Sequence, residues 1–433
     1  MADWMATTGT AISGRISAPS DKSVSHRAIM LAAIADGVSR IEGFLEGEDT
    51  RATARIFQQM GVEIETPEHG VRIVHGVGID GLHAPAAVLD CGNSGTAMRL
   101  LAGVLAAQRF ASVLSGDASL ARRPMRRVAE PLAQMGALIG TAVDGTPPLN
   151  ISPSPGLRGI DYASPVASAQ IKSALLLAGI WADGETSVRE PHPTRDYSER
   201  MLRAFGVDID YSPGFACVRG GQRLTACDVQ VPGDFSSAAF AIVAATVVPG
   251  SDLLIENVGI DPRRIGLLHA LQLMGAAIEL RNQRETPTGA MADLRVRYAP
   301  LRGSDVPVEI VPDMIDEFPI LFAAAACADG RTRVRGAAEL RVKESDRIAA
   351  MANGLRALGI DVEETPDGAD ITGGHVQGGA VESLDDHRIA MSFAVLAQRA
   401  CAPIRIRDID NVATSYPGFS AQMQAIGMAL MSA

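Results

Sequence analysis

The 433-residue chain contains almost no lysine: of its 39 basic residues, only Lys22, Lys172 and Lys343 are not arginine. An arginine side chain stays charged in proteins, whereas the compact ammonium of lysine can shift its pKa and donate a proton. Lys22 lies in the polar run 20–27 and Lys343 in the polar run 341–347. We therefore expect chemistry from these two lysines and treat Lys172 as an incidental helix residue.

Aromatic residues and paired cysteines are scarce as well. Aromatics make up 4% of the chain and the net charge is −11, which argues against nucleic-acid binding, including a role in RNA-end processing, because such binding uses a basic face and stacking side chains. The five cysteines form no CxxC pair, so neither a zinc site nor a disulfide framework is expected. Arginines concentrated in polar motifs of an acidic protein instead indicate a small, multiply charged anion as ligand.

Long apolar runs are missing too. The longest, such as 238–248, are too short to span a bilayer, and the N-terminal segment has neither the basic nor the apolar region of a secretory signal. We expect a cytoplasmic protein that does not associate with membranes. The length of the chain favours two domains over one.

A repeat runs through the whole sequence. An apolar residue, a glycine and an alternating strand pattern recur at Gly61, Gly136, Gly206, Gly275, Gly359 and Gly427. Each glycine follows a helical apolar pattern and is typical of the residue just after a helix C-terminus. Earlier in each unit, a polar residue leads into an alanine-rich helix: Ser23, Ser94, Ser168, Ser236, Asp316 and Asp386. The spacing predicts six units of about 70 residues, each with two helices and several strands.

The six units predict an α/β (α+β) protein of two domains with three units each. Residues 1–20 and 232–433 would form a discontinuous domain, into which residues 21–231 are inserted. The first helix of each unit is apolar nearly all round and should be buried. Because helix N-termini carry partial positive charge and attract anions, we expect them to face a cleft between the domains that holds the active site.

Six motifs carry a resemblance to a known family. They are, in order, 20–27, 92–96, 116–125, 168–170, 341–347 and 386–390. Together they resemble the 5-enolpyruvylshikimate-3-phosphate (EPSP) synthases over essentially the whole chain, and the class II bacterial forms most. The resemblance implies transfer of the enolpyruvyl group of phosphoenolpyruvate to the 5-hydroxyl of shikimate 3-phosphate, with release of phosphate through a tetrahedral intermediate. It implies no cofactor and no metal, since Lys and Arg can balance the charge of the anions.

The resemblance also assigns residues. The catalytic groups would be Lys22, Asp316 as base on the 5-hydroxyl, and Glu344 as proton donor to C3. The residues matching the shikimate 3-phosphate site are Lys22, Ser23, Arg27, Ser168, Ala169, Gln170, Arg195, Asp316 and Lys343. Those matching the phosphoenolpyruvate site are Lys22, Asn93, Gly95, Arg123, Gln170, Arg347 and Arg388. For Glu344 to hold a proton near neutral pH, burial must raise its pKa against the pull of Lys343 and Arg347.

Two positions refine the expectation. Thr414 stands where some members of the family carry a lysine, as in class II forms, so one contact to phosphoenolpyruvate differs. Gly95 leaves space beside the phosphate where some herbicide-tolerant members carry alanine, so we expect inhibition by glyphosate. We further expect a monomer whose lobes close on shikimate 3-phosphate.

Two other functions stay open from the sequence. The sister transferase that acts on UDP-N-acetylglucosamine shares the implied fold, but its catalytic loop carries Cys or Asp, and the segment 116–125 here has no Cys. A non-catalytic anion-binding protein would keep the helix ends without needing carboxylates such as Asp316 and Glu344. Those two carboxylates also have structural explanations, since Asp316 could cap a helix and Glu344 could form a surface ion pair with Arg347.

Overall fold

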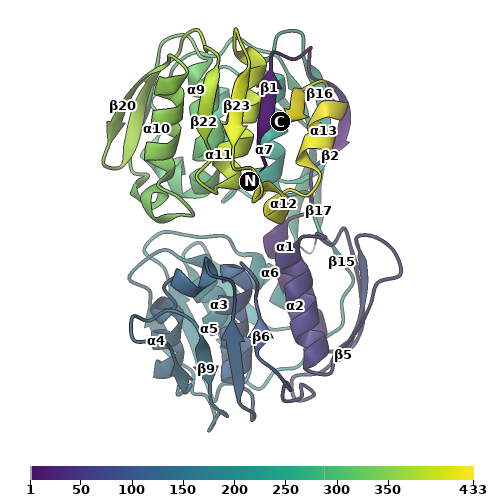
Figure 1. Ribbon diagram of the computed structural model, residues 1–433. Coiled ribbons are helices and arrows are strands. Elements are labelled where there is room, and N and C mark those ends of the chain that lie inside the picture. The colour runs from purple at the N-terminus through teal and green to yellow at the C-terminus, as the bar shows by residue number, and fades with distance from the viewer. Residues whose placement is uncertain (1, 287) are drawn as a thin grey trace. The chain divides into compact units, whose positions relative to one another are not determined.

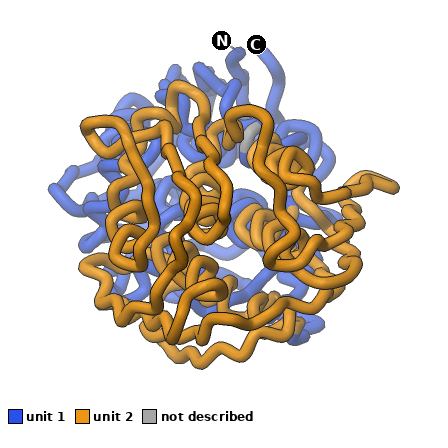
Figure 2. Tube along the Cα trace, turned by 90° about the horizontal axis from the view of Figure 1, so that it is seen from below, with its two compact units in different colours: residues 1–19, 233–285, 290–433 blue, residues 20–232, 286–289 orange. Residues whose placement is uncertain are grey.

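The computed structural model describes residues 2–286 and 288–433, which divide into two compact units. Unit 1 consists of Met1–Pro19, Gly233–Glu285 and Ala290–Ala433, and unit 2 of Ser20–Pro232 and Thr286–Gly289 (Figure 2). The chain thus leaves unit 1 after its first strands and returns once unit 2 is almost complete. Among the helices of the described residues, none has the length and apolar character that a membrane span requires.

Unit 2 contains three small sheets, each with two helices (Figure 1). The first sheet has the order β14 (Leu224–Thr225), β3 (Ala35–Glu42), β5 (Val71–Val77), β4 (Glu63–Glu65), with β15 (Val229–Gln230) also on β3, and goes with α1 (Lys22–Ala33) and α2 (Glu48–Gln59). The second has β6 (Leu89–Asp90), β7 (Ser112–Ser115), β9 (Leu149–Ile151) and β8 (Ile139–Gly140), with α3 (Gly95–Ala106) and α4 (Arg126–Gln134). The third has β10 (Asp161–Ala163), β11 (Glu185–Arg189), β13 (Phe215–Arg219) and β12 (Ile209–Ser212), with α5 (Ala169–Gly179) and α6 (Tyr197–Ala204).

Unit 1 repeats this plan with three further sheets. They are β17 (Ala277–Thr286), β18 (Gly289–Arg297), β16 (Asp252–Gly259), β2 (Ser13–Ser17); then β19 (Arg331–Val334), β21 (Gly368–Thr372), β20 (Asp361–Thr365); then β22 (Gly379–Glu382), β23 (Ile404–Arg407), β1 (Trp4–Thr7), β24 (Ala429–Ser432). The helices are α7 (Phe235–Val247), α8 (Gly266–Leu273), α9 (Phe318–Ala326), α10 (Arg347–Ala357), α11 (His387–Leu396), α12 (Val412–Ser415) and α13 (Phe419–Ala425). The N-terminal strands β1 and β2 complete two of these sheets, and β1 lies between C-terminal strands (Figure 1).

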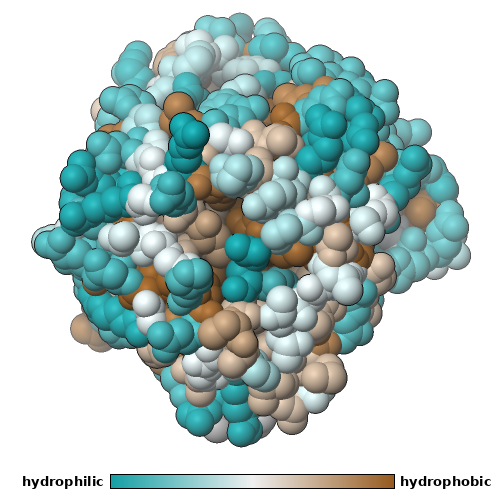
Figure 3. All heavy atoms as spheres, turned by 90° about the horizontal axis from the view of Figure 1, so that it is seen from above, coloured by the Kyte–Doolittle hydropathy of each residue, from teal (hydrophilic) through white to brown (hydrophobic). Residues whose placement is uncertain are grey.

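Each unit has a hydrophobic core of its own, built around the first helix of each repeat. Every residue of α7 and of α9 is buried, as expected for helices that are apolar all round. Removing one Leu, Ile or Phe side chain from water stabilises a fold by about 1.5–3 kcal/mol, so these helices anchor the units. Much of the outer face in Figure 3 is hydrophilic, with hydrophobic residues in small groups between.

The ends of the repeated helices follow the sequence pattern. The second helix of each repeat is followed by a glycine with positive φ: Gly61, Gly136, Gly206, Gly275, Gly359 and Gly427. Side chains with a Cβ avoid this conformation, which explains why glycine recurs there. The predicted helix ends are therefore confirmed, and six small sheets with helices agree with the predicted mixed α/β class.

The starts of the first helices follow the sequence pattern less closely than the helix ends do. Asp21, Ser94, Ser168, Asp234 and Asp386 each accept a hydrogen bond from a backbone N–H of the first turn. Asp21 and Asp234 each cap their helix two residues before the expected Ser23 and Ser236. The fifth start differs, because Asp316 lies within the 3-10 helix η2 (Val308–Glu317) and Glu317 is the N-cap of α9, without a side-chain hydrogen bond. Capping thus does not account for Asp316.

We expect Gly103→Ala to destabilise the protein although alanine favours helices. A Cβ at Gly103 of α3 would lie 2.2 Å from the carbonyl oxygen of Ala174 in α5, a backbone atom that cannot swing aside. Overpacking of this kind costs about 1–3 kcal/mol, against a helix-propensity gain of about 1 kcal/mol. Urea unfolding should show a net loss of stability; a variant as stable as wild type, or more so, would contradict the close approach of α3 and α5.

Candidate active site

Polar side chains connect the starts of the first helices within each unit. In unit 2, His26 of α1 contacts Ser94 at the start of α3, and Gln170 of α5 donates to Thr96 of α3. In unit 1, Arg388 of α11 donates to the carbonyl oxygen of Asp316, just before α9. The starts of α1, α3 and α5 in unit 2, and those of α9 and α11 in unit 1, are therefore connected through polar side chains, where helix N-termini carry partial positive charge.

Lys22 opens α1 and forms an ion pair with α2. Its Nζ lies 2.7 Å from Oδ2 of Asp49, in the first turn of α2. The Asp49 side chain is 7% exposed and that of Lys22 is 32% exposed, so the ammonium is held in place while part of it still faces water. Asp49 was not predicted as a partner of Lys22. The acidic residues Glu48 and Asp49 after Gly47 mark the first turn of a helix and were the signal that could have indicated it.

Arg27 is buried on the same helix, against two serines. Its Nε donates to Ser198 Oγ (2.7 Å), and its terminal nitrogens donate to Ser173 Oγ and to the Ser23 carbonyl (2.9 Å each). Burial lowers the pKa of Arg27 to about 10, and the nearby positive charge of Arg195 adds to the effect. Two arginines brought together in this way favour an anion between them.

Ser168, Ala169 and Gln170 form the turn into α5. Ser168 is the N-cap, and its Oγ accepts from the N–H of Ile171 at 3.4 Å. Gln170 accepts from Arg99 at 2.5 Å through Oε1 and donates to Thr96 at 3.0 Å through Nε2. Gln170 thereby fixes the start of α5 against the start of α3.

Asn93, Gly95 and Arg123 surround the start of α3. Arg123 donates to Asn93 Oδ1 at 2.8 Å, and a Cβ on Gly95 would lie 3.2 Å from Arg99 and 3.4 Å from Arg123. Burial, together with the charge of Arg123, lowers the pKa of Arg99 to about 10. A helix N-terminus flanked by two guanidinium groups suits a phosphate-type anion. Arg99 is not among the residues that the resemblance assigns, although its place four residues after Gly95 puts both on one helix face.

Arg347 is the centre of the unit 1 cluster. Its side chain is 1% exposed and contacts three carboxylates: Asp386 Oδ2 at 2.8 Å, Glu344 Oε2 at 2.7 Å and Asp316 Oδ1 at 3.3 Å. Burial opposes its charge, but the three carboxylates outweigh that effect and raise the pKa of Arg347. The predicted base and the predicted acid therefore meet at one guanidinium group.

The pKa of Glu344 is a correction to the sequence analysis. Burial alone would raise it, but the positive charge of Arg347 outweighs burial and holds the pKa of this carboxyl well below its usual range. Glu344 is therefore ionised near neutral pH while Arg347 pairs with it. Lys343, which was expected to lower the pKa of Glu344 as well, instead pairs with Glu339 at 2.7 Å through its Nζ.

Lys172 is a second correction. It is not incidental: its side chain is 3% exposed, and its Nζ lies 2.9 Å from Glu190 and 2.8 Å from Glu199. These two ion pairs were not recognisable in the sequence, because Glu190 lies in a loop and Glu199 on another helix.

The expected site residues thus fall into two groups. Unit 2 holds Lys22, Ser23, Arg27, Asn93, Gly95, Arg123, Ser168, Ala169, Gln170 and Arg195, and unit 1 holds Asp316, Lys343, Glu344, Arg347 and Arg388. The side chain of Thr414 lies outside the described residues.

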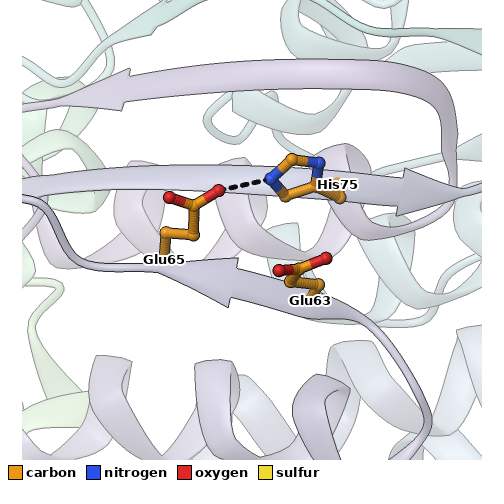
Figure 4. A group of neighbouring side chains, drawn as sticks. All are labelled: Glu63, Glu65 and His75. Carbon is orange, nitrogen blue, oxygen red and sulfur yellow. Dashed lines mark hydrogen bonds and ion pairs between the residues drawn. The ribbon is translucent and has the colours of Figure 1, made fainter.

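A further group of ionisable residues lies on the first sheet of unit 2. Glu63 and Glu65 of β4 and His75 of β5 have side-chain ligand atoms within 4.8 Å of one another (Figure 4). His75 Nε2 lies 2.6 Å from Glu65 Oε1, and all three side chains are at least partly exposed. A carboxylate–histidine pair on neighbouring strands accounts for the group, and we assign no ion to it.

Comparison with known proteins identifies the family. The profile of EPSP synthase (3-phosphoshikimate 1-carboxyvinyltransferase) matches residues 6–423. A 3-phosphoshikimate 1-carboxyvinyltransferase of Xanthomonas axonopodis pv. citri (strain 306) is 65% identical over 430 residues, 99% of this chain and 98% of the relative. The chain belongs to the EPSP synthase family. The function expected from the resemblance is thereby confirmed: 3-phosphoshikimate 1-carboxyvinyltransferase activity in the shikimate pathway, with phosphoenolpyruvate and shikimate 3-phosphate as substrates.

Solved structures agree with this membership. The EPSP synthase from Acinetobacter baumannii superposes with a TM-score of 0.94 at 49% identity, covering 100% of both chains. The enolpyruvyl transferase NikO from Streptomyces tendae superposes with a TM-score of 0.81 and covers 100% of this chain and 99% of its own. At 18% identity it shows that the fold is shared and no more.

We expect His26 to make stability depend on pH. Its ring contacts Thr53 Oγ1 at 2.8 Å and Ser94 Oγ at 3.2 Å, and burial lowers its pKa from 6.5 to about 3. Below pH ~6.5 the unfolded chain binds a proton at His26 and the folded protein does not. The free energy of unfolding therefore decreases as the pH is lowered, by up to ~1.4 kcal/mol per pH unit. Urea unfolding between pH 6.5 and 4.5 should give a shallower dependence for His26→Gln. Equal slopes for the two proteins would contradict a neutral His26.

Proposed function

We propose that the two groups of residues act on one pair of substrates, which requires unit 1 and unit 2 to meet around them. The observation that carries this proposal is the meeting of Asp316 and Glu344 at the guanidinium of Arg347. A base and an acid of one reaction have to stand within reach of the same substrate atoms. Two carboxylates held by one arginine from different segments fit that requirement, and an anion-binding protein would not need them.

Shikimate 3-phosphate is assigned to the start of α1 and α5. Its phosphate would lie between Arg27 and Arg195 at the N-terminus of α5, where Ser168 and Gln170 supply hydrogen-bonding groups. The mutual proximity of the two arginines supports this assignment, because a dianion removes their repulsion.

Phosphoenolpyruvate is assigned to groups from both units. Its phosphate would lie at the start of α3 beside Gly95 and Arg123, with Lys22 reaching both substrates. Arg347 and Arg388 would take its carboxylate and the remaining phosphate charge. Arginine suits both groups, since its planar fork binds carboxylate and phosphate oxygens in pairs.

The chemistry then proceeds as an addition followed by an elimination. Asp316 accepts the proton of the 5-hydroxyl while the oxygen of that hydroxyl bonds to C2 of phosphoenolpyruvate. Glu344 gives a proton to C3. In the second step C3 returns a proton to Glu344, the C2–O bond to phosphate breaks, and the leaving phosphate takes up the proton that Asp316 holds. Lys22 and the arginines stabilise the negative charge that builds up on the leaving phosphate.

Glu344 acquires its proton through substrate binding. In the present structure Arg347 keeps Glu344 ionised. An anion placed on Arg347 competes with that carboxylate and cancels the charge that stabilises it, so the pKa of Glu344 rises toward neutrality. Glu344 is thus protonated only when phosphoenolpyruvate is bound.

The finer expectations belong to the same proposal. We assign the chain to the class II forms on the motifs that carry the resemblance and on Thr414 in place of a lysine. Glyphosate would compete with phosphoenolpyruvate, and the enzyme would act as a cytoplasmic monomer.

The proposed roles are tested by phosphate release with both substrates in EDTA, using wild type, Asp316→Asn and Asp313→Asn. Asp313 is a matched control on the same 3-10 helix, where it pairs with Arg263 at 3.5 Å. General-base catalysis contributes ~10²–10⁴-fold, so Asp316→Asn should lose at least ~100-fold in kcat and Asp313→Asn less than ~2-fold.

Other outcomes would contradict the account. Phosphate release with UDP-N-acetylglucosamine but not with shikimate 3-phosphate would point to the sister transferase. Equal losses in the two aspartate variants would remove Asp316 as the base.

We expect Gly95→Ala to weaken inhibition by glyphosate more than binding of phosphoenolpyruvate. The added Cβ lies against Arg99 and Arg123 at 3.2 and 3.4 Å, so these guanidinium ends have to move and the phosphate pocket becomes shorter. The longer inhibitor loses more contacts than the substrate does. The glyphosate inhibition constant should rise by at least ~10-fold, the cost of one or two displaced hydrogen bonds. The KM of shikimate 3-phosphate serves as the control and should stay unchanged; an unaltered inhibition constant would contradict the placement of the inhibitor.

A further inference from the structure

Three buried ionisable residues lie beneath the turn that leads into α5. Lys172 of α5 pairs with Glu190, just after β11, at 2.9 Å and with Glu199 of α6 at 2.8 Å. The three side chains are 3%, 0% and 2% exposed. Burying charged groups costs free energy unless they are fully paired. The triad is therefore not explained as a solvated surface group.

The two carboxylates of the triad are not equivalent. Glu190 receives three donors: the Lys172 ammonium, the N–H of Ser168 at 3.1 Å and the hydroxyl of Thr194 at 2.8 Å. Glu199 receives Lys172 through Oε1, whereas its Oε2 is buried without a hydrogen-bond partner among the described residues. A buried carboxylate needs several donors, so Glu190 is the better satisfied of the two carboxylates. Burial also raises the pKa of Glu199 against the pull of Lys172.

Glu190 connects the triad to the groups assigned to the substrate phosphate. Through Ser168 it holds the N-cap of α5, and through Thr194 it holds the residue next to Arg195. One charged carboxylate therefore fixes two separate segments of the phosphate site.

The same two helices also position Arg27. Ser173 follows Lys172 and Ser198 precedes Glu199; the two serine hydroxyls lie 2.7 Å apart and both accept from Arg27. The register between α5 and α6 that the triad sets is therefore also the register that places the Arg27 guanidinium.

We propose that Lys172 and Glu190 are positioning residues for the phosphate of shikimate 3-phosphate, acting through Ser168 and Thr194, with Glu199 as a second partner of Lys172. None of the three touches the substrate. The inference rests on the proposed function, which places that phosphate at Ser168 and Arg195.

The matched variants Glu190→Gln and Glu199→Gln test this inference. Both remove one carboxylate from the same lysine and keep an amide in its place. In Glu190→Gln, Lys172 keeps Glu199 as its counter-charge, so the protein still folds, but Ser168 and Thr194 lose their carboxylate acceptor. In Glu199→Gln, Lys172 keeps Glu190, and the bonds from Ser168 and Thr194 to Glu190 are unchanged.

Titration calorimetry with shikimate 3-phosphate alone is the direct readout. Glu190→Gln should weaken binding by about tenfold, as expected for losing hydrogen bonds to a charged group, while Glu199→Gln should stay within about twofold of wild type. In steady state, Glu190→Gln should raise the KM of shikimate 3-phosphate with kcat nearly unchanged. Leu176→Ala, a fully buried truncation on the same helix, controls for stability and should lower the Tm without changing the affinity.

Two outcomes separate the possible failures. If Arg195→Gln weakens binding but the two glutamate variants behave alike, the triad is merely structural and the inference is wrong. If Arg195→Gln also binds shikimate 3-phosphate as wild type does, the phosphate lies elsewhere and the proposed site itself fails.

Discussion

The ion cluster around Arg347 is the constraint on which the unit 1 site depends. A guanidinium group almost removed from water has to be neutralised, and it is neutralised by carboxylates from three segments: the end of η2, the loop before α10 and the start of α11. Removing one partner of such a buried group typically costs about 3–5 kcal/mol, so these segments hold each other in place. In the proposed mechanism a substrate anion would reach Arg347 only by competing with a carboxylate, which would link binding to proton transfer.

Unit 2 meets the same constraint with separate pairs. Lys22 has Asp49, Arg27 has two serines and a carbonyl, and Lys172 has two glutamates. The charged partners, Asp49, Glu190 and Glu199, lie on second helices or in a loop, whereas the cations of unit 2 stand on first helices. The repeat therefore does more than build sheets: its buried helix supplies the N-terminus and the cation, and its neighbours supply the counter-charge. This division leaves the cations fixed, with arginines close enough to repel one another until an anion binds.

Local signals made the fold accessible from the sequence. Glycines such as Gly136 and Gly359 mark helix ends because only that residue type takes a positive φ easily, and this holds whatever surrounds it. The residues proposed for the site come from the sequence motifs, which are local patterns too. Charge partners could not be found in this way: Asp49, Glu190 and Glu199 meet their lysines only after folding. The ionised state of Glu344 was missed because it depends on a short distance to Arg347, and sequence spacing alone does not reveal whether burial or charge prevails.

The central claim is that occupation of Arg347 by an anion protonates Glu344. Proton uptake on ligand binding measures this directly, by calorimetry in buffers of different ionisation enthalpy, with shikimate 3-phosphate and a non-reacting phosphoenolpyruvate analogue that keeps both phosphate and carboxylate. Comparison of wild type with Glu344→Gln cancels the ionisation of the ligands themselves. On binding the two ligands near neutral pH, wild type should take up close to one more proton than Glu344→Gln. Equal uptake by the two proteins would contradict it.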